Sequence, residues 1–313
     1  AMWPREGLMT SEDVWWGMTL GSAEMLQSGV TTSCEMYLFE EAVVTAAQQT
    51  GARLVMTPVV ISESKRNLKE HITDLTQLYD RYHDPAGRTT VGIAAHSAYD
   101  LGIDPVAELA GLARSLDTTL HLHLAETREE SADLERKFGQ SITRILYDNG
   151  VFDGRVLAAH SVWVDRTDIE LMAESEVAVA HCPVSNMKLG AGIAPLVDLR
   201  AAGVTVGYGT DGPASNDSLD LWEEVKIAPL LARVQALDST AITAAETLAM
   251  ATREGAAAVG LHDTGSLIAG NAADMIRIDL DQSTFVPVTS PDELIAHLAW
   301  SGSNRLVTDV WVA

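Results

Sequence analysis

Short apolar runs alternate with helix-like segments along most of this chain of 313 residues. Strands this apolar, separated by helices, are typical of a parallel sheet covered on both faces. Such units over about 200 residues favour an α/β fold, a (β/α)8 barrel of the TIM type with one strand unaccounted for. A doubly wound open sheet is the alternative. The runs are Val30–Tyr37, Arg53–Val60, Thr90–Ala98, Thr118–Glu126, Arg155–Val162, Glu176–Pro183 and Val204–Gly212.

Helix signals fall between these runs. Ser11–Ser28 is predicted as a helix with Ser11 as its N-cap, and it stops at Gly29. Pro105–Leu116 is a second predicted helix, with Asp104 as cap and proline at the first helical position.

The charge of the chain excludes several partners. Lys plus Arg number 21 and Asp plus Glu number 44, which gives a net charge of −23. A surface this acidic repels phosphate backbones and anionic lipid, so we expect no nucleic acid and no membrane as partner. No apolar run approaches the roughly 18 residues that a membrane span needs. Two cysteines, Cys34 and Cys182, exclude a disulfide framework and indicate a reducing, cytoplasmic location.

The pattern changes after Gly260. The stretch 265–279 is predicted as turn, short strand, turn, strand, and Leu306–Val312 as a further strand. We therefore expect a barrel over residues 1–260 and a small C-terminal β segment over 261–313 that packs on it.

Polar side chains gather where the predicted strands end. In a parallel barrel the carboxyl ends of the strands meet at one mouth, where catalysis takes place. Each such residue alone is more often structural, but their coincidence at successive strands predicts a shared polar site. They are His96, His123, Glu126, His160, His181 and Asp211.

Imidazole nitrogens with a carboxylate suit Zn²⁺ or another borderline divalent ion. Such an ion lowers the pKa of a bound water toward neutrality. A carboxyl group beside it can move protons.

Here the sequence resembles the amidohydrolase superfamily, in the branch of methylthioadenosine/S-adenosylhomocysteine deaminases and chlorohydrolase-like enzymes. The resemblance covers essentially the whole chain. The matching stretches are Gly29-Val30-Thr31-Thr32 through Met36-Tyr37, His121-Leu122-His123-Leu124-Ala125-Glu126-Thr127, Ala159-His160-Ser161-Val162, His181-Cys182-Pro183-Val184-Ser185-Asn186-Met187-Lys188-Leu189-Gly190, Gly209-Thr210-Asp211-Gly212-Pro213-Ala214-Ser215-Asn216, Gly270-Asn271-Ala272-Ala273-Asp274 and the Trp3-Pro4 entry.

The resemblance implies a role for each mouth residue. His123 and Asp211 would be metal ligands. Glu126 would carry a proton to the substrate ring nitrogen, and His160 would contact the metal-bound water. Asp211 and His160 would also take the proton from that water. His96, Glu126 and Asp211 would contact the substrate.

Binuclear relatives carry a lysine at the end of the fourth strand, but Ala94-Ala95-His96-Ser97 has none, so we expect one divalent metal ion, Zn²⁺ or Fe²⁺. We expect His181 to shape its loop, His121 to be structural and Cys182 to be a buried small residue. Asn216 and Asp217 are expected to orient the loop after the last strand.

Two departures from the family pattern matter. The His-x-His pair of the first strand, and the glutamate that grips the ribose, are expected to lie before Ala1. We therefore expect an internal piece of a longer protein, with an open seam between Val30–Tyr37 and Val204–Gly212. In addition, Pro58 stands where S-adenosylhomocysteine deaminases carry an arginine, and only Lys65 and Arg66 are nearby.

The resemblance implies a hydrolase acting on carbon–nitrogen bonds, a deaminase of a purine or adenosine-like nucleoside. The alternatives are a triazine-type amino or chloro hydrolase, a cyclic amidase, or a barrel that only binds. The expected partner is a small-molecule substrate. A homo-oligomer would use Trp15-Trp16 or the Leu230-Leu231 region as its surface.

Overall fold

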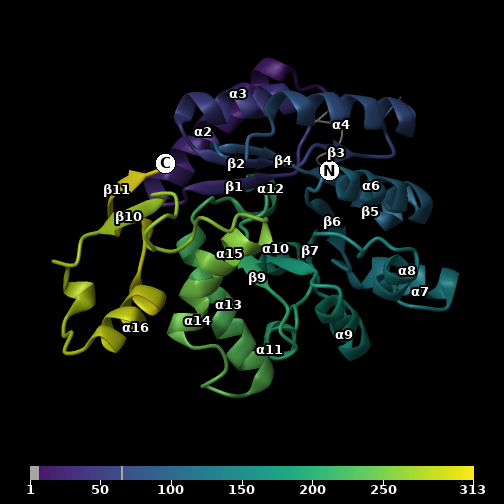
Figure 1. Cartoon of the computed structure of the whole chain (residues 1–313). Helices are drawn as coiled ribbons and strands as arrows, with labels where there is room; N and C mark the ends of the chain where they lie inside the picture. Colours follow the sequence, from purple (N-terminus) through teal and green to yellow (C-terminus); the bar gives the residue numbers. More distant parts are fainter. Residues whose placement is uncertain (1–6, 65) are drawn as a thin grey trace.

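The computed structural model describes residues 7–64 and 66–313, so the Trp3-Pro4 match and Lys65 lie outside the described residues. Parallel strands form the wall of the structure (Figure 1). One sheet has the order β1 (Thr32–Glu35), β2 (Arg53–Met56), β4 (Thr89–Val91). The other has the order β3 (Val59–Val60), β5 (Ile93–Ser97), β6 (Leu120–Leu124), β7 (Val156–His160), β8 (Ala178–His181), β9 (Val206–Tyr208).

Two predicted strands are each split in the structure. Arg53–Val60 breaks at Thr57-Pro58 into β2 and β3, because proline has no N–H for the ladder. The next strand breaks at Gly92 into β4 and β5. The ladder continues across both breaks, since the Gly92 N–H donates to the Met56 carbonyl at 2.7 Å. A Cβ at Gly92 would lie 2.8 Å from the carbonyl oxygen of Thr119, so glycine is required there. The predicted parallel α/β barrel wall is therefore confirmed.

Among the described residues, the first and last strands of the parallel wall, β1 and β9, each keep one unpaired edge. Within the described residues β1 pairs only with β2, and β9 pairs only with β8. The seam expected between Val30–Tyr37 and Val204–Gly212 is present.

Helices follow the strands and cover the wall (Figure 1). They are α2 (Ser11–Ser28), α3 (Glu40–Thr50), α4 (Leu68–Tyr82), α5 (Ala98–Leu101), α6 (Ile103–Ser115), α7 (Arg128–Phe138), α8 (Ile142–Asp148), α9 (Arg166–Glu174), α10 (Pro183–Leu189), α11 (Leu196–Ala201), α12 (Pro213–Asn216), α13 (Leu221–Ala236), α14 (Ala244–Met250) and α15 (Arg253–Ala258).

Two predicted helix starts were wrong. Thr10, not Ser11, caps α2, because Thr10 and Asp13 form a reciprocal capping box. The helix expected from Pro105 begins two residues earlier at Ile103 and is preceded by Gly102 at φ 84°. Proline tolerates any position in the first turn, so it does not fix the start.

Burial on both faces explains the apolar strands. In β6, Leu120, Leu122 and Leu124 share one face and are at most 1% exposed, and His121 on the opposite face is 7% exposed. His121 and His123 lie between them in sequence. The same packing therefore holds the site residues at fixed positions along the strand.

The C-terminal segment adds an antiparallel pair, β10 (Met275–Ile278) with β11 (Val307–Trp311), and helix α16 (Pro291–Ser301). Only one strand forms within 265–279, so the prediction of a short strand before it was wrong. Gly265 and Gly270 both have positive φ, and the backbone between them forms turns instead of a strand. The buried guanidinium of Arg53 in β2 binds the Asp274 carboxylate through Nε at 2.7 Å and Nη2 at 3.0 Å. The boundary at residue 260 stays a prediction.

Within 7–64 and 66–313, every helix is too short or too polar to cross a bilayer.

Candidate active site

The carboxyl ends of β5, β6 and β7 bring the predicted histidines together. The ring centroids of His96 and His123 lie 4.8 Å apart, and those of His123 and His160 lie 5.3 Å apart and nearly parallel. The register pairs His123 with Ala159 and Leu124 with His160, so neighbouring strands end level. The structure therefore brings His96, His123 and His160 side by side, and their sharing of one functional site stays a prediction.

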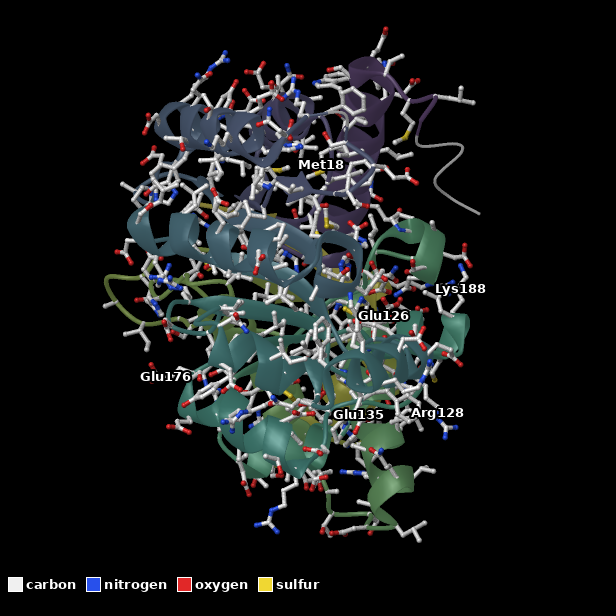
Figure 2. The ribbon with its side chains drawn as sticks, turned by 90° about the vertical axis from the view of Figure 1, so that its right-hand side faces the viewer. Met18, Glu126, Arg128, Glu135, Glu176 and Lys188 are labelled. Atoms are coloured by element: carbon white, nitrogen blue, oxygen red, sulfur yellow. The ribbon has the colours of Figure 1, made fainter. Side chains whose placement is uncertain are left out.

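Glu126 follows β6 and faces His160. Its Oε2 atom lies 3.9 Å from Nε2 of His160, too long for a hydrogen bond but close enough for both groups to contact one small molecule. The carboxylate is 18% exposed, whereas the imidazole is 2% exposed. Figure 2 shows Glu126 near the middle of the view, below Met18 and to the left of Lys188.

Left-handed backbone conformations mark the ends of these strands. Ala125, His160, Ser161 and Asp211 have φ between 48° and 70°, in a region that non-glycine residues seldom adopt. Each such residue costs of order 1 kcal/mol or more, and such strain is concentrated at functional sites. His160 is the last residue of β7, and Asp211 lies in the loop that follows β9.

Hydrogen bonds fix the ring orientation of two histidines. Nδ1 of His123 lies 2.8 Å from the main-chain oxygen of His96, and Nδ1 of His160 lies 3.0 Å from Oδ1 of Asn186. Both partners are acceptors as placed, so each Nδ1 carries the proton and each Nε2 presents its lone pair. Burial, followed by the nearby His160, holds the pKa of His123 well below 6.5, which keeps it neutral and able to ligate a metal.

Asp211 lies in the loop after β9. Its Oδ2 accepts a hydrogen bond from the Ser185 hydroxyl at 2.7 Å, and its Oδ1 accepts from the Gly212 N–H at 2.7 Å. Each carboxylate oxygen keeps a further lone pair. Asp211 is therefore oriented from one side and available from the other.

His96 contacts a different partner. Its Nδ1 lies 3.3 Å from Oδ2 of Asp100, and the hydroxyl of Ser62 also binds Asp100. Asp100 thus connects the loop after β3 to the histidine expected to contact substrate.

The other polar residues of the mouth are buried. His121 is 7% exposed and its Nδ1 lies 3.0 Å from the Thr57 hydroxyl, in keeping with a structural role. His181 is 3% exposed, and burial lowers its pKa to about 4. Burial raises the pKa of the Cys182 thiol well above 9.0, so this thiol is not a ready thiolate ligand.

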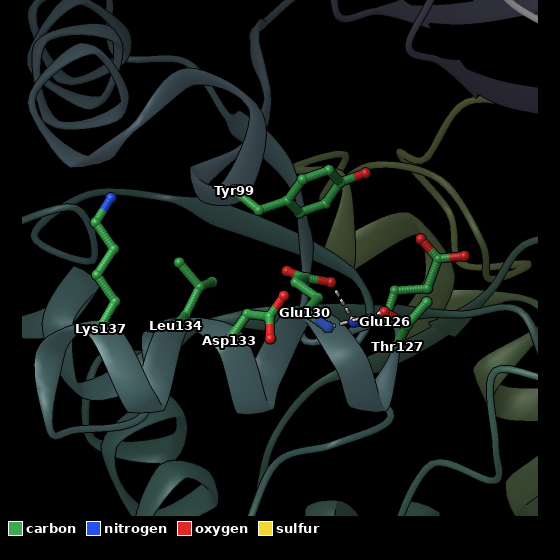
Figure 3. Close-up of a pocket in the computed structure, with 7 residues that line it drawn as sticks. All are labelled: Tyr99, Glu126, Thr127, Glu130, Asp133, Leu134 and Lys137. Carbon is green, nitrogen blue, oxygen red and sulfur yellow. Dashed lines mark hydrogen bonds between the residues drawn. The ribbon is translucent and has the colours of Figure 1, made fainter.

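A cavity of about 510 Å³ opens beside Glu126 (Figure 3). It lies between Tyr99 and helix α7, and the Glu130 carboxylate in it accepts from the N–H of Glu126 at 3.2 Å. Burial raises the pKa of Glu130 to about 7. Its lining residues are Tyr99, Glu126, Thr127, Glu130, Asp133, Leu134 and Lys137.

The donor types fit a divalent metal ion. His123 and His160 present free Nε2 atoms and Asp211 presents carboxylate oxygen, the ligands that Zn²⁺ prefers. In the same loops, four buried side-chain atoms have no hydrogen-bond partner among residues 7–64 and 66–313, namely Ser161 Oγ, His181 Nδ1, Asn186 Nδ2 and Asn216 Oδ1. In the described part of the chain, no three His, Cys, Asp or Glu side chains are arranged to hold a metal ion by themselves.

The sequence did not predict the roles of several residues near the site. Ser185 and Asn186 lie in a recognised motif but had no assigned role, and Asp100 and Glu224 were not singled out. A signal existed for Glu224: it shares a helical face with buried Ala228 and Ala232 of α13, four and eight residues on.

Comparison with known proteins identifies the family of this chain. Residues 3–313 match the amidohydrolase family. The chain belongs to the amidohydrolase family. The amidohydrolase is 38% identical over 313 residues to 5-methylthioadenosine/S-adenosylhomocysteine deaminase of Thermoanaerobacter pseudethanolicus, covering 99% of this chain and 72% of that protein.

Solved structures agree with the fold. An adenosine deaminase from Xanthomonas campestris with bound zinc superposes with a TM-score of 0.94 at 34% identity, covering 99% of this chain and 71% of that one. The atrazine chlorohydrolase of Arthrobacter aurescens complexed with zinc gives a TM-score of 0.85 at 27% identity, covering 94% and 70%. Both neighbours were crystallised with zinc, which supports a divalent metal in this amidohydrolase.

Proposed function

We propose that this amidohydrolase is a metal-dependent hydrolytic deaminase of an adenosine-like purine nucleoside. The observation that carries the proposal is the placement of the Glu126 carboxylate opposite His160, whose ring lies against that of His123. This arrangement offers a proton donor and a proton acceptor around one small space, to which the loop after β9 would add the carboxylate of Asp211. The deaminase relative and the adenosine deaminase neighbour support the same reaction class.

The roles of the residues are part of the proposal. His123 and Asp211 would hold the ion, which when bound polarises water and lowers its pKa toward neutrality. His160 and Asp211 would accept the proton of the attacking water. Glu126 would donate a proton to the ring nitrogen next to the amino-bearing carbon, and ammonia would leave. His96 would contact the substrate.

The site favours a small neutral ring. The cavity beside Glu126 has the size usual for small-molecule sites. Its carboxylates, Glu126, Glu130 and Asp133, outnumber its one lysine, Lys137. The proposed partner is therefore a small molecule without a large negative charge.

The test is ammonia release from adenosine and 5′-methylthioadenosine by zinc-loaded protein, followed also by the change in adenine absorbance. A chlorotriazine and a cyclic amide serve as competing substrates. Deamination of a nucleoside with no turnover of the triazine supports the proposal. Turnover of the triazine alone would assign the chain to the chlorohydrolase-like alternative, and binding without any turnover would leave only a binding barrel.

A further inference from the structure

Two consecutive residues of α10 each hold one of the proposed catalytic groups. The Ser185 hydroxyl donates to Oδ2 of Asp211 at 2.7 Å, and Oδ1 of Asn186 lies 3.0 Å from Nδ1 of His160. Ser185 is 0% exposed and Asn186 is 1% exposed. A small shift of this one turn would therefore misplace Asp211 and His160 together.

One buried carboxylate connects this turn to the loop that carries Asp211. Oε2 of Glu224 accepts from the Val184 N–H at 3.2 Å, and Oε1 accepts from Nδ2 of Asn216 at 2.9 Å. Val184 directly precedes Ser185. Nδ2 of Asn216 also donates to the carbonyl oxygen of Thr210, the residue before Asp211, at 2.7 Å.

Glu224 belongs to neither loop. It projects from α13 and is 0% exposed. The Val184 N–H lies in the first turn of α10, where backbone donors have no partner within the helix, and Glu224 supplies one. Its two oxygens therefore fix the loops after β8 and β9 relative to one another.

A carboxylate is a costly choice for this position. The neighbouring buried positions of α13 are apolar, including Val225 and Ala228, and burial raises the pKa of Glu224 to about 7. An apolar side chain would fill the space without removing a charge from water. What only the carboxylate provides is two acceptors that point at two different loops.

We propose that Glu224 is a positioning residue that acts through Val184 and Asn216 to hold Ser185 on Asp211 and Asn186 on His160. It does not touch the reacting atoms itself. Replacement of Glu224 by glutamine keeps the shape of the side chain. Its amide NH₂ group would then face either the Val184 N–H or Nδ2 of Asn216, and that donor would lose its acceptor.

The first test is Glu224→Gln, with Glu223→Gln as the matched control, because Glu223 is the exposed neighbour on the same helix. We expect kcat to fall at least roughly 10-fold in Glu224→Gln with KM changed less than about twofold, since misoriented groups slow chemistry more than binding. The control should match the wild type. Wild-type kcat in folded Glu224→Gln would overturn the proposal.

Double-mutant cycles separate positioning from a general loss of packing. If Glu224 acts through the α10 turn, its effect on kcat should be smaller in an Asn186→Ala or Ser185→Ala background than in the wild type, because each background removes one of the two routes. Additive effects in both backgrounds would contradict the proposed route.

A spectroscopic readout keeps the test independent of turnover. The His160 Nδ1 proton, held by Asn186, should give a slowly exchanging downfield imidazole signal. We expect this signal to exchange faster in Glu224→Gln. If that variant does not fold, Asn216→Ala removes the same link from the other side. An unchanged His160 signal in a folded variant refutes the proposal, whether or not the protein deaminates nucleosides.

Discussion

Nδ1 of His123 donates to the main-chain oxygen of His96 at 2.8 Å, so the adjacent strand decides which ring nitrogen of His123 faces the barrel mouth. Such outer contacts commonly orient metal-binding histidines. Because the acceptor is a backbone atom, no substitution of the His96 side chain removes it. The orientation of His123 and the proposed substrate contact of His96 can therefore be separated by mutation.

Glu126→Gln is expected to abolish turnover and retain metal. The change removes the proposed proton donor, while His123 and its bond to the His96 carbonyl stay in place. The rate should fall about 10²-fold or more, the usual scale for a positioned general acid–base group. Metal content and kcat measured on one preparation check this, and near-normal kcat with full metal occupancy contradicts the role.

Asp211→Asn should be more damaging than Glu126→Gln. It removes a proposed ligand charge and a proposed base together, and the single amide oxygen can replace only one of the two carboxylate oxygens that accept from Ser185 and Gly212. We expect both metal affinity and kcat to fall, as measured by a zinc competition titration and by steady-state kinetics. Stoichiometric metal with substantial turnover would show that the loop after β9 does not carry the ligand.

Acid should destabilise the protein partly through His181. Its folded pKa of about 4 lies below the ordinary value of 6.5, so the unfolded chain binds the extra proton first. Stability is thus fully present above pH 6.5 and is lost as the pH falls toward 4, by up to roughly 3 kcal/mol. His181→Gln should flatten this part of the curve of unfolding free energy against pH, whereas His262→Gln, at an exposed position, should leave it unchanged.

Adenosine or a short 5′-modified adenosine should be deaminated better than S-adenosylhomocysteine. The guanidinium of Arg66 is paired with Asp74, and Arg88 binds the Gly51 carbonyl at the amino end of β4, away from the mouth. A carboxylate tail would lose the charge-assisted hydrogen bonds that a free arginine provides. A higher kcat/KM for S-adenosylhomocysteine than for adenosine would mean that another cation binds the tail.

Asp274→Asn should lower the free energy of unfolding by about 3 kcal/mol, because it leaves a buried guanidinium without its counter-charge. The side chains of Arg53 and Asp274 are 6% and 3% exposed. Asp281→Asn, on the exposed part of the same segment, is the matched control. Denaturant unfolding of the three proteins measures the difference, and equal stabilities would show that the pair contributes nothing.

Much of this architecture could be predicted from the sequence because burial on both faces makes each strand apolar throughout. The order of the strands and the positions of His123, Glu126, His160 and Asp211 near their ends follow from that pattern and from chain direction. The break at Pro58 was missed, although proline itself signals it. Contacts between loops could not be read in the same way. Glu224 reaches residues 40 and 8 positions away, and such distances carry no periodic signal.

The position of the Arg53–Asp274 pair bears on how the substrate preference of this fold can change during evolution. Arg53 begins β2, at the opposite end of the strand from the site, and its Nη2 also donates to the main-chain oxygen of Ala313 at 3.0 Å. The segment that carries β10 and β11 is thus attached at the amino end of the strands, opposite the proposed substrate site. Loops at the mouth can therefore change in length or sequence without disturbing the contacts of Arg53. A new substrate preference can arise while β10 and β11 stay attached to the wall.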